Sequence, residues 1–123
     1  MESVQKAQTL NQLIRTMDEQ GVTGAKRYDS LRRFIGMQAR KNRTPVSGSF
    51  ELTPQCNLDC KMCYVHLCKE QMNGAELLPV QTWIDIAQQA IDAGMMYVQL
   101  TGGECLTYPG FRELYLFLQE KGI

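Results

Sequence analysis

The most informative segment of this chain is Thr53-Pro54-Gln55-Cys56-Asn57-Leu58-Asp59-Cys60-Lys61-Met62-Cys63-Tyr64, which holds three cysteines at Cx3Cx2C spacing. Thiolates are soft ligands, so three of them this close together can hold one iron–sulfur cluster or three corners of a zinc site. A cluster with four irons needs a ligand on each iron. Three cysteines therefore leave one iron open to a ligand that is not protein, and an open iron can do chemistry.

The residues around this segment predict a strand before it and a helix after it. Residues 46–53 alternate apolar and polar side chains, as half-buried strands do, and Pro54 ends the run because proline cannot donate to a sheet ladder. After a loop over residues 54–78, Pro79 stands at a position favoured for helix starts. Gly94 ends this helix, whose predicted buried stripe is Val80, Trp83, Ile84, Ala87, Ala90 and Ile91.

A second strand and a further helix follow in the sequence. The strand is indicated by apolar residues at every second position, Met96, Val98 and Leu100. Pro109 begins a helix that Gly122 ends, with an apolar face of Phe111, Leu114, Tyr115, Phe117 and Leu118. The core is predicted to include three large side chains, Trp83, Met95 and Met96.

The order strand, helix, strand predicts a parallel βαβ unit. Gly102-Gly103-Glu104 comes directly after the second strand, as the cysteines come after the first. Parallel strands end at the same edge of a sheet and lie about 4.8 Å apart. The cysteine loop and the Gly-Gly-Glu turn should therefore be close, at the carboxyl edge where α/β sheets and barrels bind ligands.

The cysteine triplet together with Thr101-Gly102-Gly103-Glu104 resembles the start of a radical S-adenosyl-L-methionine (SAM) enzyme, in the branch that matures peptides and proteins. The resemblance covers roughly Val46 to Ile123. It implies an α/β fold that begins a partial (β/α) TIM-like barrel, with residues 45–123 as the N-terminal part of the radical SAM core. We expect the chain to be a fragment of a longer enzyme, because the later strands of such a barrel would follow.

The resemblance also implies a role for each site residue. Cys56, Cys60 and Cys63 would ligate a [4Fe-4S] cluster whose open iron binds SAM. The reduced cluster would cleave SAM to a 5′-deoxyadenosyl radical that abstracts a substrate hydrogen. The turn residues Gly102, Gly103 and Glu104 would meet the SAM amino group, while Met62 and Tyr64 would lie near the adenine. A low-potential flavodoxin or ferredoxin would supply electrons, and a peptide or protein is the favoured substrate.

Residues 1–44 predict a helical extension before this core. An apolar period suggests a helix over residues 1–20, with Val4 and Ala7 on its stripe, and Gly21 and Gly24 bracket a break before a second helix. Asp29 is the only acidic residue between residues 22 and 44, against seven basic ones. Such a charge run is usually a solvated face, and the alternative is a docking surface for an acidic peptide or partner.

Other interpretations of the cysteines stay open from the sequence. A zinc-stabilised structural or partner-binding module could use His66 or Cys68 as a fourth ligand. Cys68 is otherwise a spare thiol, and Cys105 is predicted to be a buried neighbour of the strand end. Thirteen basic and thirteen acidic residues cancel, which argues for neither nucleic acid nor membrane as partner. Clustered cysteines without a signal peptide or an apolar span favour the reducing cytoplasm.

Overall fold

The computed structural model describes residues 9–65, 67, 71–72 and 74–123, and the chain divides into two compact units, Met1–Thr44 and Pro45–Ile123. The second unit contains, in order, β1 (Ser47–Thr53), α5 (Val80–Asp92), β2 (Tyr97–Gly102), a 3-10 turn η1 (Cys105–Thr107) and α6 (Phe111–Glu120). β1 and β2 pair in parallel, as predicted. The unit is therefore α/β with a two-stranded parallel sheet, while a barrel stays a prediction.

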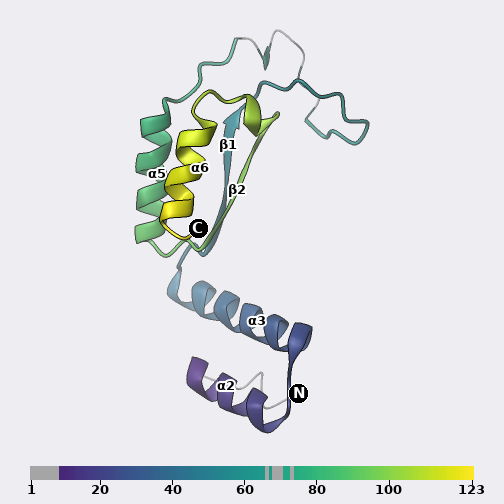
Figure 1. The fold of residues 1–123 in the computed structure, drawn as a ribbon, viewed down its shortest axis with the longest axis vertical. Coiled ribbons are helices and arrows are strands. Elements are labelled where there is room, and N and C mark those ends of the chain that lie inside the picture. The colour runs from purple at the N-terminus through teal and green to yellow at the C-terminus, as the bar shows by residue number, and fades with distance from the viewer. Residues whose placement is uncertain (1–8, 66, 68–70, 73) are drawn as a thin grey trace. The chain divides into compact units, whose positions relative to one another are not determined.

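The core of the second unit lies between the sheet and its helices. Figure 1 shows α5 and α6 side by side along the same face of the two strands. The alternation in β1 sends Phe50 and Leu52 into this core, and Leu114 and Leu118 of α6 are almost fully buried there. Trp83 packs against Phe50, with ring centroids 5.3 Å apart. The polar residues that alternate with Phe50 and Leu52 in β1, Ser49 and Glu51, are exposed.

Three details of the predicted elements differ from the structure. Met95 is buried, but β2 begins only at Tyr97, so Met96 precedes the strand and its side chain is 46% exposed. Tyr115 is not in the core either; it is 51% exposed and stacks on Phe111. The last helix starts at residue 111 rather than at Pro109, because the chain first makes the 3-10 turn η1 and Gly110 caps the helix.

The first unit pairs α2 (Leu10–Glu19) with α3 (Gly24–Asn42). A continuous helix over residues 1–20 is wrong: Thr9 is extended and caps α2, and its hydroxyl and the Gln12 side chain each accept a hydrogen bond from the other's backbone N–H. Residues 1–8, with Val4 and Ala7, lie outside the described residues. The buried side chains shared by the two helices are Leu13, Met17 and Phe34.

No helix among the described residues combines the length and the apolar character that crossing a membrane requires.

Candidate functional site

The turn after β2 is hydrogen-bonded to the start of the cysteine loop. The Gly103 N–H donates to the Thr53 carbonyl over 2.7 Å, and the Glu104 N–H donates to the Gln55 carbonyl over 2.8 Å. The Thr107 hydroxyl donates to the same Gln55 oxygen at 3.4 Å. Because Cys56 is the next residue, the parallel sheet does bring the Gly-Gly-Glu turn and the first cysteine together at its carboxyl edge, as the strand order predicts.

This backbone contact requires glycine both at Gly102, the last residue of β2, and at Gly103, which follows it. A Cβ on Gly103 would collide with the Gln55 carbonyl oxygen and lie 2.6 Å from that of Pro54. Gly102 has φ +138°, which side chains disfavour, and a Cβ there would collide with the Thr53 carbonyl oxygen. The resemblance implies that these glycines meet the SAM amino group, and that role stays a prediction. The structure gives an additional reason for glycine, which is the close approach of two protein segments.

The Glu104 carboxylate is held by hydrogen bonds to only one of its two oxygens. Its Oε1 accepts hydrogen bonds from the Leu106 N–H at 2.9 Å and from the Cys105 thiol at 3.7 Å. Oε2 accepts no hydrogen bond within the described part of the chain. The pKa of Cys105 is raised, mainly by burial and further by the neighbouring Glu104 carboxylate, so the thiol stays a donor at neutral pH. The turn thus presents an anchored carboxylate oxygen for a cationic group.

The three cysteines of the triplet lie on the loop after β1. Cys56 is half-buried and its thiol donates to the Leu58 carbonyl at 3.8 Å, whereas Cys60 and Cys63 are exposed and joined by a backbone turn, with the Cys63 N–H donating to the Cys60 carbonyl. No group of three or more His, Cys, Asp or Glu side chains that could hold a metal is assembled among the described residues.

The donor chemistry nevertheless fits an iron–sulfur cluster. Three cysteine thiols within one short loop, two of them exposed, are the kind of ligand set that such clusters take. His66 and Cys68, the candidate fourth zinc ligands, lie outside the described residues. The side chains of Met62 and Tyr64 are 90% and 91% exposed, so neither packs into the protein. Their contact with adenine stays a prediction.

Tyr108 ties the far end of the cysteine loop to the same turn, and the sequence did not single it out. Its side chain is buried to 4% exposure, and its hydroxyl donates to the Leu78 carbonyl at 2.6 Å. The residues after β2 therefore hold both ends of the loop, Thr53–Gln55 at its start and Leu78 at its end. A buried tyrosine usually finds a hydrogen-bond partner, but only the fold reveals which one.

Replacing Tyr108 with phenylalanine should loosen this loop while keeping the ring packing. Loss of one hydrogen bond should cost about 1 kcal/mol of unfolding free energy, and proteolysis between residues 56 and 78 should become faster. Urea unfolding and timed protease digestion measure the two effects.

Tyr115→Phe is the matched control, because this exposed hydroxyl has no hydrogen-bond partner in the described part of the chain. Equal digestion rates for the Tyr108 and Tyr115 variants would show that the Tyr108 hydroxyl does not restrain the loop.

Comparison with known proteins gives partial matches to curated enzymes. The chain is 37% identical over 70 residues to the sporulation killing factor maturation protein of Bacillus subtilis, covering 57% of this chain and 16% of that protein. It is 36% identical over 70 residues to the PqqA peptide cyclase of Gluconobacter oxydans, which is 57% of this chain and 19% of that enzyme. The GTP 3′,8-cyclase of Helicobacter pylori is 34% identical over 62 residues, 50% of this chain and 19% of that enzyme.

These matches cover only a small part of each relative, between 16% and 19% of its length. No family model matches the chain. No solved structure matches it either.

Proposed function

The chain is related to radical SAM enzymes, the class of the three relatives named above, and from this premise we propose that the whole protein is an iron–sulfur enzyme that cleaves SAM. The observation that carries the proposal is the pair of hydrogen bonds from Gly103 and Glu104 to Thr53 and Gln55. They fix an acidic glycine turn beside the first cysteine of a Cx3Cx2C loop.

Cys56, Cys60 and Cys63 would be the three protein ligands of a [4Fe-4S] cluster. When bound, such a cluster supplies one electron to the sulfonium of SAM, which yields the 5′-deoxyadenosyl radical that abstracts a substrate hydrogen. Cys56 sits on the segment anchored by the turn, while Cys60 and Cys63 are exposed on the loop beyond it. The chain thus offers one positioned thiol and two accessible ones.

Glu104 would hold the amino group of SAM. Its Oε1 is already engaged by Leu106 and Cys105, so the carboxylate is oriented before any ligand arrives. The second oxygen can then accept a hydrogen bond from an ammonium, and charge-assisted bonds of this kind are the strong ones. The backbone of Gly102 and Gly103 would border this group, and Met62 and Tyr64 on the exposed loop would pack near the adenine.

We propose a peptide or protein as the substrate. One matched relative is named a PqqA peptide cyclase, and another a sporulation killing factor maturation protein. The GTP cyclase shows that a nucleotide substrate also occurs among the relatives. A low-potential flavodoxin or ferredoxin would be the electron donor.

Anaerobic reconstitution tests the cofactor proposal. Incubation of the chain with iron and sulfide should give a brown protein with about four irons per chain. Its dithionite-reduced electron paramagnetic resonance signal should change when SAM is added. The opposite result would be a colourless protein that contains zinc by elemental analysis and keeps this zinc when iron is added. That result would support a zinc-stabilised module.

A further inference from the structure

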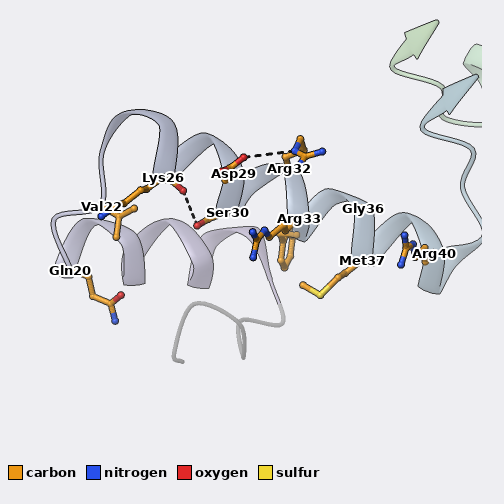
Figure 2. A pocket seen from close by; sticks show the side chains of 11 residues that line it. Gln20, Val22, Lys26, Asp29, Ser30, Arg32, Arg33, Gly36, Met37 and Arg40 are labelled. Atoms are coloured by element: carbon orange, nitrogen blue, oxygen red, sulfur yellow. Dashed lines mark hydrogen bonds and ion pairs between the residues drawn. The ribbon is translucent and has the colours of Figure 1, made fainter. Parts of the chain in front are cut away.

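A groove in the first unit is lined mostly by one face of α3. Figure 2 shows its lining residues, which come from α3 and from the turn before it. Lys26, Arg33 and Arg40 stand seven residues apart on this helix, with Ser30 and Met37 between them. Spacings of three and four residues keep side chains on one helix face, so these five form a single stripe. At 1.5 Å per residue the three cations recur about every 10.5 Å.

The cations of this stripe have no partner of opposite charge in the described part of the chain. Arg27 pairs with Asp18 across the two helices, and Arg32 reaches Asp29 at 3.9 Å, as the dashed line in Figure 2 shows. Lys26, Arg33 and Arg40 form no ion pair there, and all three are exposed. Asp29 is the only acidic residue that lines the groove among the residues that the structure describes, and it already pairs with Arg32.

The groove also has apolar surface. Met37 is 50% exposed between Arg33 and Arg40, and Val22 and the largely buried Phe34 also line the groove. Methionine adapts its shape to varied apolar partners. Cations at a regular interval around an exposed thioether favour a ligand with matching anions and an apolar side chain between them.

The charge of the chain is divided unevenly between its two units. Residues 1–44 contain nine basic and four acidic side chains, whereas residues 45–123 contain four and nine. The net charge of zero for the chain conceals this asymmetry. The excess positive charge of the first unit attracts acidic partners over roughly a Debye length, about 8–10 Å at physiological salt.

We propose that this groove binds an acidic polypeptide segment, as a helix whose carboxylates recur every seven residues with an apolar side chain between them. Seven residues of helix advance about 10.5 Å, which equals the spacing of Lys26, Arg33 and Arg40. Helix-in-groove binding with apolar anchors at helical spacing is an established mode of recognition. The proposal does not depend on the metal chemistry, because no cysteine is involved.

Fluorescence anisotropy with the full chain tests this proposal. The probe is a labelled, helix-forming peptide with glutamates seven residues apart and leucines between them. Two control peptides have glutamine in place of glutamate, or the same composition with the glutamates moved to different faces. We expect the matched peptide to bind at least about tenfold more tightly than either control, and its binding to weaken as salt is raised.

Lys26→Glu with Arg33→Glu should weaken binding of the matched peptide by about tenfold or more, because two attractions become repulsions. The charge-matched control is Arg15→Glu with Lys41→Glu, two exposed residues of the same unit that do not line the groove. Circular dichroism of both variants checks that the helices remain.

Three outcomes would overturn the proposal. Equal weakening by both double variants would mean that only net charge matters. Tighter binding of an RNA oligomer than of the matched peptide would show an anion site for nucleic acid. Concentration-dependent dimerisation of the chain that Lys26→Glu with Arg33→Glu abolishes would make the acidic unit of a second copy the occupant.

Discussion

Replacing Cys60 with alanine should remove most of the iron that the reconstituted chain binds. Three thiolates leave no spare protein ligand in the triplet, so loss of one exposes a further iron and the cluster should not survive gel filtration. We expect iron per chain to fall several-fold, with loss of the brown absorbance. Iron and sulfide analysis after anaerobic desalting measures this.

Cys105→Ala is the matched control, because Cys105 does not lie on the cysteine loop. Its side chain is half-buried against the core, and its thiol donates a hydrogen bond to Glu104. This variant should keep its iron. If Cys60→Ala also retained a full complement of iron, Cys60 would not be a ligand, and the iron–sulfur assignment of the triplet would be wrong. Iron lost equally from both variants would indicate general unfolding instead.

Replacing Gly103 with alanine should destabilise the chain even without cluster or SAM. The new Cβ would collide with the Gln55 carbonyl and crowd that of Pro54, so the two hydrogen bonds that hold the turn on β1 could not both form. We expect a loss of roughly 2–4 kcal/mol in unfolding free energy. Urea unfolding followed by the fluorescence of Trp83, the only tryptophan of the chain, reports on this unit.

Gly48→Ala is the matched control in the same sheet. A Cβ at Gly48 would meet only the Met95 sulfur, at an ordinary 3.6 Å, and alanine suits a strand interior better than glycine does. This variant should be neutral or more stable by up to about 1 kcal/mol. If Gly103→Ala left the unfolding free energy of the cluster-free chain unchanged, glycine would be needed at this position only for contact with a ligand.

The sequence determined the order of elements and the edge at which the site lies. Alternation in residues 46–53 predicted β1, and the apolar stripe after Pro79 predicted α5. Apolar residues at every second position from Met96 to Leu100 predicted β2. Parallel pairing then required the two loops to meet, and the hydrogen bonds from Gly103 to Thr53 and from Glu104 to Gln55 confirm that they do. Periodicity works here because each element buries one face, and burial leaves a trace in the spacing of apolar residues.

Periodicity could not determine the exposure of every residue on an apolar stripe. Met96 and Tyr115 fit the apolar pattern yet are about half exposed, because only part of the sheet and helix faces another element. Thr9 breaks the first helix by capping, a local hydrogen-bond choice that competes with a continuous apolar period.

Only the tertiary structure decided how the cysteine loop is held. Its two ends are fixed by Gly103, Glu104 and Thr107 on one side and by Tyr108 on the other, contacts between residues that are 30 to 52 positions apart. The amino-acid sequence shows which hydrogen-bond donors and acceptors are present, but it does not show which of them pair across so many residues. The residue types could thus indicate the chemistry of the site, whereas its positioning depends on backbone contacts that form only when the strands are side by side.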